Sequence, residues 1–192
     1  AMGGMETMEE QVLKYSEDPS NPRFSPLYIP KMLLDSSSGV ISLHYGLRGV
    51  NYNTASACAS TNHALIDAFY QLRLGKADII VSGGSEAAIT PSSIGGFGSA
   101  QALSTRNDDP QHASRPFDVT RDGFVLGEGS CALILEEYGH AVRRGAKIYA
   151  EIVGGGSSAD AYHATAAHPE GEGAYLSMRS ALRRALSCRR IA

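Results

Sequence analysis

The stretch NTASACASTNHALIDAF, Asn53–Phe69, joins two different hydrophobic patterns and decides the fold class. Val50–Ala57 has a strand-like pattern, whereas Ser60–Leu74 carries apolar side chains at helical spacing and is followed by Gly75, a natural helix terminator. A short apolar run at Asp78–Ser82 is typical of a buried strand. Strand, helix and strand in succession predict an α/β protein with a mostly parallel, doubly covered sheet.

Further helices and strands are expected on both sides of this unit. The helices are predicted at Glu6–Tyr15, Lys31–Tyr45, Glu137–Arg144 and Gly173–Ala185, and the strands at Ser130–Glu136 and Lys147–Val153. Thr90 followed by Pro91 predicts the N-cap and first residue of another short helix. The polar stretch Ser104–Gly123 has no periodicity, so it is expected to be a long loop of the kind that carries function or moves.

Composition excludes several classes of function. The chain has 192 residues, 43% of them apolar, and a formal net charge of −3, which disfavours nucleic acid or an anionic membrane as the main partner. No apolar run approaches a membrane span, and the first residues lack the pattern of a signal peptide. Three widely spaced cysteines form neither a disulfide framework nor a zinc-ligand pattern, so we expect a reducing, cytoplasmic location and no metal site.

Cys58 stands at the expected junction between strand and helix. The unpaired N–H groups at a helix N-terminus favour an anion, and therefore the reactive thiolate form of a cysteine there. The alternative is that Cys58 is a small buried side chain, as most free cysteines are. Position alone leaves both interpretations open. Cys131 lies inside an apolar strand and is expected in the core, whereas Cys188 lies in a basic tail and has no evident role.

Three long motifs resemble the β-ketoacyl-acyl carrier protein synthases, the type II condensing enzymes of fatty acid synthesis. They are SACASTNHALIDAF, GKADIIVSGGSEAAITPSSIGGFGSAQALSTRNDDPQHASRPFDVTRDGFVLGEG and RRGAKIYAEIVGGGSSADAYHATAAHPEG. The resemblance implies an α/β, thiolase-like fold with α-β-α-β-α layers and mixed sheets. Residues 1–192 would form a partial ketosynthase domain, about one half of that fold plus the start of the second. Its first strands and most of its C-terminal half would be missing.

The same resemblance implies roles for five residues. Cys58 would be the acyl-accepting nucleophile, Phe97 would line the acyl pocket, and Met2 would limit chain length. Tyr28 would reach the pocket of a partner subunit, because these enzymes are homodimers, and Thr165 would lie near the phosphopantetheine channel. Core packing is the alternative for Phe97, Met2 and Tyr28. The implied partner is acyl carrier protein, which carries the substrates on its phosphopantetheine, with no bound cofactor.

Part of the family's catalytic set does not occur in this sequence. The family uses one histidine in an HGT motif and another in a GHxxGAAG-like motif, and both motifs are absent from the 192 residues. His63 lies about one and a half helical turns after Cys58, so we interpret it as structural. Glu128, between two glycines, is interpreted as a partner for backbone N–H groups and not as a general base.

The sequence therefore predicts a condensing acyltransferase that is inactive as this chain alone. A non-catalytic fragment or dimer partner of the same fold remains an alternative, although Cys58 argues against it. A polyketide ketosynthase or a thiolase is the other alternative, and the STRNDDP and RDGFVLGEG motifs disfavour the thiolase.

Overall fold

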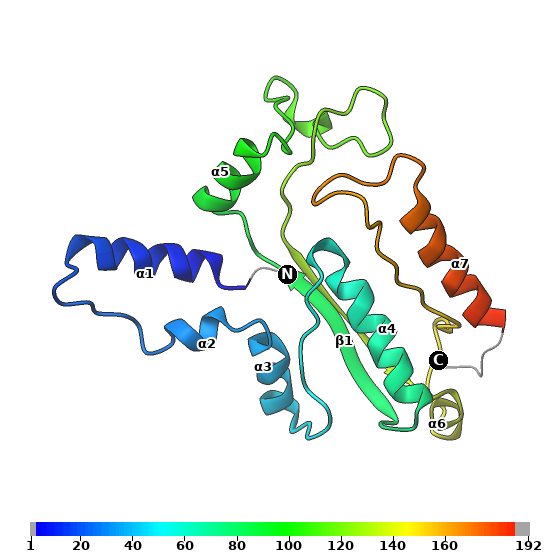
Figure 1. Ribbon diagram of the computed structural model, residues 1–192. Coiled ribbons are helices and arrows are strands. Elements are labelled where there is room, and N and C mark those ends of the chain that lie inside the picture. Colours follow the sequence, from blue (N-terminus) through cyan, green and yellow to red (C-terminus); the bar gives the residue numbers. More distant parts are fainter. Residues whose placement is uncertain (1–2, 187–192) are drawn as a thin grey trace. The chain divides into compact units, whose positions relative to one another are not determined.

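A computed structural model describes residues 3–186, which fall into two compact units. The first unit comprises residues 1–53 and 85–130, and the second comprises residues 54–84 and 131–192. The chain therefore passes between the units three times, and each unit is described by itself (Figure 1).

The first unit is mainly helical. Its elements are α1 (Met5–Glu17), α2 (Tyr28–Met32), α3 (Ser36–Tyr45), α5 (Pro91–Ser99) and the single turn η2 (Pro110–His112). The buried Gln11 on α1 accepts the N–H of Ser25 through its Oε1 at 2.7 Å. Glu9 accepts the N–H of Ser92 at 2.8 Å. These two bonds fasten α1 to the segment before α2 and to the first turn of α5.

The second unit contains η1 (Ala57–Ala59), α4 (Ser60–Arg73), most of β1 (Ile79–Glu86) and β2 (Gly129–Glu136), α6 (Tyr138–Arg143) and α7 (Glu172–Leu186). Within the described residues, β1 and β2 form a sheet of two strands. The N–H of Glu137, after β2, donates to the carbonyl of Asp78, before β1, at 2.9 Å, so the two strands run antiparallel. The mostly parallel pairing that the sequence predicts is therefore not found between these two strands.

The core of the second unit lies between α4 and the sheet. Phe69 is completely buried, and Ala68, Leu72 and Leu135 pack with it. Gly84 lets β1 approach α4 closely, since a Cβ there would collide with the side chain of Thr61. The apolar stripe that the sequence predicts for this helix is therefore the one that is buried.

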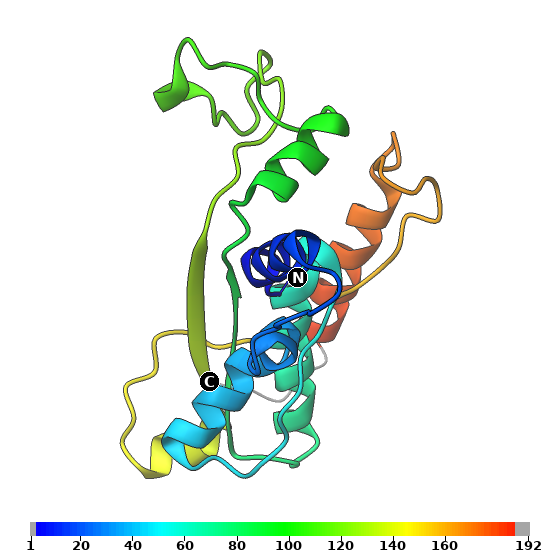
Figure 2. The same ribbon diagram turned by 90° about the vertical axis from the view of Figure 1, so that its left-hand side faces the viewer.

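A glycine-rich segment passes between α4 and α7 (Figures 1 and 2). A Cβ on Gly155 would lie 2.6 Å from the side chain of Ile66 on α4. A Cβ on Gly154 or Gly156 would instead meet the backbone of α7 at Ala181, at 2.6 and 2.7 Å. Three consecutive glycines thus allow two helices to flank one extended chain.

Most predicted helices are confirmed, and their ends lie within two residues of the predicted ones. Thr90 caps α5 by accepting the N–H of Ser93 at 3.3 Å, and Pro91 is the first helical residue. Gly75 after α4 and Gly145 after α6 have φ values of 65° and 68°, the left-handed conformation in which glycine ends a helix. Ser104–Gly123 is the loop that the sequence predicts, apart from the one turn of η2.

Three predicted elements differ from the structure. Lys31–Tyr45 is not one helix, because the chain breaks at Leu33–Asp35 and serine hydroxyls there bond backbone carbonyls: Ser36 donates to Pro30, and Ser38 to Asp35 at 2.9 Å. Val50–Ala57 is not a strand. The side chains of Asn51 and Asn53 instead donate to the carbonyls of Ser38 and Leu34.

Lys147–Val153 is also irregular, and only Ile152 in it has bridge geometry. Alternating apolar residues form a strand only when a neighbouring strand pairs with their N–H and C=O groups.

Candidate active site

Cys58 is exposed on the single turn η1, immediately before α4. The preceding Ala57 has a φ of 50°, in the left-handed region that residues with a Cβ avoid at a cost of about 1–2 kcal/mol. Such strained residues persist only where their surroundings hold them, and they concentrate at functional sites. The sharp turn at Ala57 therefore presents the sulfur of Cys58 at the start of a helix.

Hydroxyl groups hold this turn. The Oγ of Ser60 accepts the N–H of Ser56 at 2.9 Å and donates to the carbonyl of Ala57 at 2.7 Å. The Oγ1 of Thr54 donates to the carbonyl of Ser60 at 2.9 Å. The first residue of α4 thus fixes the two residues that come before Cys58.

His63 lies on the first turns of α4, and its Nδ1 contacts the Oγ of Ser56 at 2.5 Å. This bond directs Nδ1 to the turn that precedes Cys58, which agrees with the structural role predicted for this histidine. No feature of the sequence predicts that Ser56 is its partner.

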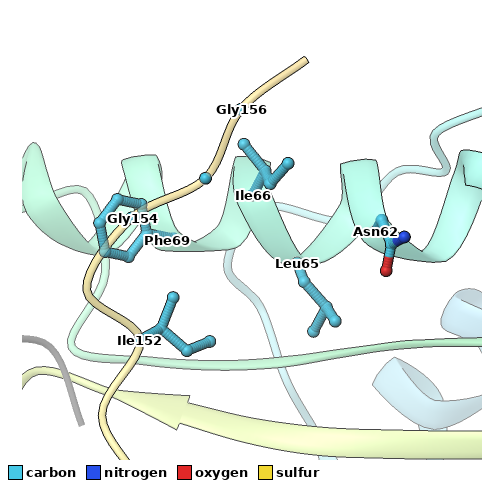
Figure 3. A pocket seen from close by; sticks show the side chains of 8 residues that line it. Asn62, Leu65, Ile66, Phe69, Ile152, Gly154 and Gly156 are labelled. Atoms are coloured by element: carbon cyan, nitrogen blue, oxygen red, sulfur yellow. The ribbon is translucent and has the colours of Figure 1, made fainter. Parts of the chain in front are cut away.

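An apolar groove runs along α4, beginning one turn after Cys58 (Figure 3). It is lined by Asn62, Leu65, Ile66 and Phe69 of α4 and by Ile152 and Gly154–Gly156 of the neighbouring segment. Asn62 supplies the one polar side chain of this lining. The groove was not predicted from the sequence, although the helical spacing of these four α4 residues and the run of glycines both indicate a place where chains approach closely.

Thr165 lies in the same unit as Cys58, on the exposed loop between the glycine-rich segment and α7. Its N–H donates to the Nδ1 of His163 at 3.2 Å. Asp160 accepts the N–H of His168 at 3.0 Å across this loop. Figure 1 shows the loop (orange) at the end of the unit where α4 begins.

Phe97 and Tyr28 belong to the other unit. Phe97, half-buried on α5, meets the ring of Phe124 edge-on with 5.1 Å between centroids. Tyr28, at the start of α2, stacks on Phe24 with 5.5 Å between centroids. Met2 and Cys188 lie outside the described residues.

Glu128 accepts the N–H of Ile89 at 2.9 Å, which confirms its interpretation as a partner for the backbone. The expectation that Cys131 is buried is wrong, because this residue is exposed on β2. Only Leu135 and Glu136, at the end of β2, are buried within the strand. No described element covers the remainder, so an apolar strand did not produce a buried cysteine.

A buried carboxylate with two charged or polar partners lies at the end of β2. Arg144 donates to both carboxylate oxygens of Glu136 at 2.7 and 2.6 Å, and His140 contacts the same carboxylate. Arg144, and then His140, lower the pKa of Glu136 from 4.5 to about 2. This cluster braces β2 against α6.

No group of three histidine, cysteine, aspartate or glutamate side chains in residues 3–186 is placed to hold a metal ion. None of the helices in this part of the chain has the length and apolar character needed to cross a membrane.

Comparison with known proteins gives one consistent relationship. A family model described as the N-terminal domain of β-ketoacyl synthase matches residues 1–141. The chain is 51% identical over 85% of its length to a putative mitochondrial 3-oxoacyl-[acyl-carrier-protein] synthase of Schizosaccharomyces pombe. It is also 51% identical, over 90% of its length, to 3-oxoacyl-[acyl-carrier-protein] synthase 2 of Synechocystis.

A solved structure agrees with these relatives. The ketosynthase of a type II polyketide synthase, in complex with its acyl carrier protein and bound to a hexaketide, matches 94% of this chain with a TM-score of 0.89 and 36% identity. The chain covers 38% and 41% of the lengths of the two sequence relatives and 45% of that solved chain.

Proposed function

Because the chain belongs to the β-ketoacyl synthase family, we propose that it carries the acyl-accepting step of a 3-oxoacyl-acyl carrier protein synthase of fatty acid elongation. The observation that supports this proposal is the exposed Cys58 at the start of α4, behind the left-handed turn at Ala57. Both residues lie within the part of the chain that the family model matches.

In the first half-reaction, the thiolate of Cys58 attacks the carbonyl carbon of an acyl thioester on acyl carrier protein. The carbon–sulfur bond to phosphopantetheine breaks, the carrier thiol leaves with a proton, and the acyl group becomes a thioester of Cys58. α4 begins two residues after Cys58, and N–H groups at a helix N-terminus are suited to stabilise the oxyanion that forms transiently.

In the second half-reaction, malonyl carrier protein loses CO2, and the electron pair of the broken carbon–carbon bond attacks the Cys58 thioester. The products are a 3-oxoacyl carrier protein, CO2 and the free Cys58 thiolate. The two histidine motifs of this family are absent from the 192 residues, so this chain alone is expected to stop at the acyl-enzyme.

The remaining roles extend the same proposal. Phe97 lines the acyl pocket, Met2 limits chain length, and Thr165 lies beside the phosphopantetheine arm. Tyr28 reaches the pocket of the second subunit of a homodimer. Residues 1–192 belong to one ketosynthase domain, which works in a reducing, cytoplasmic compartment where Cys58 stays a thiol. Acyl carrier protein is the partner, as it is of the polyketide ketosynthase.

Acyl transfer to the chain tests the proposal directly. The 192-residue protein is incubated with octanoyl-acyl carrier protein, digested and analysed by mass spectrometry. We expect the octanoyl mass on the peptide that contains Cys58, and no octanoyl transfer to Cys58→Ala. The matched control Cys131→Ser, which alters the other cysteine that is exposed within residues 3–186, keeps the modification. Octanoylation that persists in Cys58→Ala, or that falls equally on Cys131, contradicts the proposal.

Adding malonyl carrier protein tests the condensation step separately. We expect no 3-oxoacyl product from this chain alone, because it lacks both histidine motifs. A measurable 3-oxoacyl product would refute that expectation.

A polyketide ketosynthase is the second candidate, favoured by the likeness to the hexaketide-bound enzyme. The two candidates differ in the acyl group that Cys58 accepts. Preference for a saturated acyl carrier protein supports fatty acid elongation, whereas preference for a poly-β-ketoacyl carrier protein supports the polyketide enzyme.

A further inference from the structure

We propose that Ser56 and His63 form a positioning pair that holds the turn presenting the Cys58 sulfur. The inference rests on the proposed function in one respect, namely that Cys58 is the nucleophile. The pair itself is defined by the contact between Ser56 Oγ and His63 Nδ1 at 2.5 Å.

Ser56 is fixed through all of its polar groups. Its N–H donates to Ser60 Oγ at 2.9 Å, and its carbonyl accepts the N–H of Ala59 at 3.1 Å. Its hydroxyl is bonded to His63. Any other backbone conformation at Ser56 would therefore break at least one of these hydrogen bonds.

The pair holds a residue that would otherwise relax. Ala57 follows Ser56 directly and has the left-handed φ of 50°. Its carbonyl accepts from Ser60, but that bond alone does not fix the peptide on the other side of Ala57. That peptide is held by the N–H of Ala59, which donates to the Ser56 carbonyl, and the contact with His63 adds a tie through the Ser56 side chain. Cys58, the next residue, thus stays at the N-terminal end of α4.

His63 is suited to this role because α4 is anchored. Ser60 and His63 lie three residues apart, so they share one face of the helix, and both contact Ser56. Two turns further on, Phe69 and Leu72 are buried in the core. A weak local turn is thereby tied at two points to a helix that packs on the sheet.

The alkylation rate of the Cys58 thiol tests whether the Ser56–His63 pair positions it. The 192-residue protein is treated with iodoacetamide, and the alkylation rates of Cys58 and Cys131 are measured by mass spectrometry in the same sample. Cys131 is exposed and lies outside the turn, so its rate is the internal reference. We expect Ser56→Ala and His63→Ala each to lower the ratio of the Cys58 rate to the Cys131 rate by about 2- to 10-fold, the range of one lost hydrogen bond.

Two further variants separate positioning from general structural damage. The double variant Ser56→Ala/His63→Ala is expected to lower the ratio no further than either single change, because one shared bond is lost only once. His63→Asn places an amide where Nδ1 stood and is expected to restore the ratio to within twofold of the wild type. Ser42→Ala, which removes a hydroxyl bonded to the Leu47 carbonyl, is the control and leaves the ratio unchanged.

Three results would overturn the inference. They are single-variant ratios within twofold of the wild type, an additive double variant, or His63→Asn behaving as His63→Ala. If circular dichroism shows that His63→Ala loses helix content, the ratios of Ser56→Ala and His63→Asn still test whether the pair positions Cys58. Alkylation needs no carrier protein, so a failure of octanoyl transfer would count against the proposed function while leaving this test intact.

Discussion

Glu136 shows how a single carboxylate is made acceptable in the interior. Only 5% of its surface is exposed, and Arg144 contacts both of its oxygens. A buried charge that is paired and hydrogen-bonded is tolerated, whereas an unpaired one is strongly disfavoured. Nothing in SCALILE distinguishes this glutamate from a surface residue at the end of a strand, because its partner Arg144 comes from the far end of α6.

The low pKa of Glu136 makes stability depend on pH. As the pH falls below 4.5, the unfolded chain takes up a proton at this position, whereas the folded chain stays ionised down to about 2. The stabilisation that the ionised Glu136 contributes to the folded chain is therefore present above pH 4.5 and is lost as the pH falls towards 2. We expect Glu136→Gln to flatten the acid limb of the stability curve in this window.

Urea unfolding at a series of pH values measures this effect. The exposed Glu10 on α1 provides the matched control, and Glu10→Gln is expected to keep the acid limb of the wild type. Equal acid limbs in Glu136→Gln and the wild type would show that the contact with Arg144 contributes nothing to stability.

Cys58 was only partly predicted from the sequence. The sequence predicted its position before a helix and left two roles open. The structure places it on the surface, behind a strained alanine, which disfavours the alternative of a small packed side chain. For Cys131 the prediction was wrong, since its apolar strand predicted burial and the residue is exposed.

Among the elements, the glycine-rich segment decides how α7 packs. A Cβ on Gly156 would lie 2.7 Å from the backbone nitrogen of Ala181 and closer still to the carbonyl oxygen of Ser177. Both are backbone atoms, so no rotamer change can relieve the collision. The segment and α7 must therefore separate when this position carries a side chain.

We expect Gly156→Ala to lower the free energy of unfolding by about 1–3 kcal/mol, the usual cost of overpacking. Hydrogen exchange should accelerate in α7 more than in α4. Gly129→Ala is the control, because nothing lies within 4 Å of a Cβ at Gly129. Protection of α7 that is the same in Gly156→Ala as in the wild type would show that the contact is not tight.

The sequence predicted the helices better than the strands. The stripe of α4, the Thr90 cap and the glycine after α4 are local signals, and each is confirmed. A helix satisfies its backbone within the element, whereas a strand depends on a neighbour. Val50–Ala57 and Lys147–Val153 have strand-like patterns but no regular strand pairing, so pattern alone was insufficient.

At the scale of the whole molecule, the chain exposes more surface than its mass requires. Its accessible area is 13873 Å², whereas two separate compact bodies that share 20.3 kDa would expose about 10,600 Å². Large apolar side chains contribute to the excess, among them Phe117, which is 99% exposed, and Leu182, which is 68% exposed. Apolar surface on this scale marks sites of association.

We therefore expect the 192-residue chain to self-associate at micromolar concentration and to bind a hydrophobic dye such as ANS. Sedimentation velocity and dye fluorescence measure the two effects. Added salt should not disperse the assemblies, because the contacts are apolar rather than ionic. A monomer that unfolds in one cooperative transition and binds no dye would contradict this expectation.

Sequence alone predicts the family, the helix that follows Cys58 and the caps that end the helices, because these depend on local spacing and on long specific motifs. Packing in three dimensions establishes which apolar residues are covered, that Ser56 is the partner of His63, and that Arg144 pairs with Glu136. These contacts join residues whose side chains meet only after turns, strands and helices have packed. Burial and pairing are properties of that packing, even for partners that lie close together in the sequence.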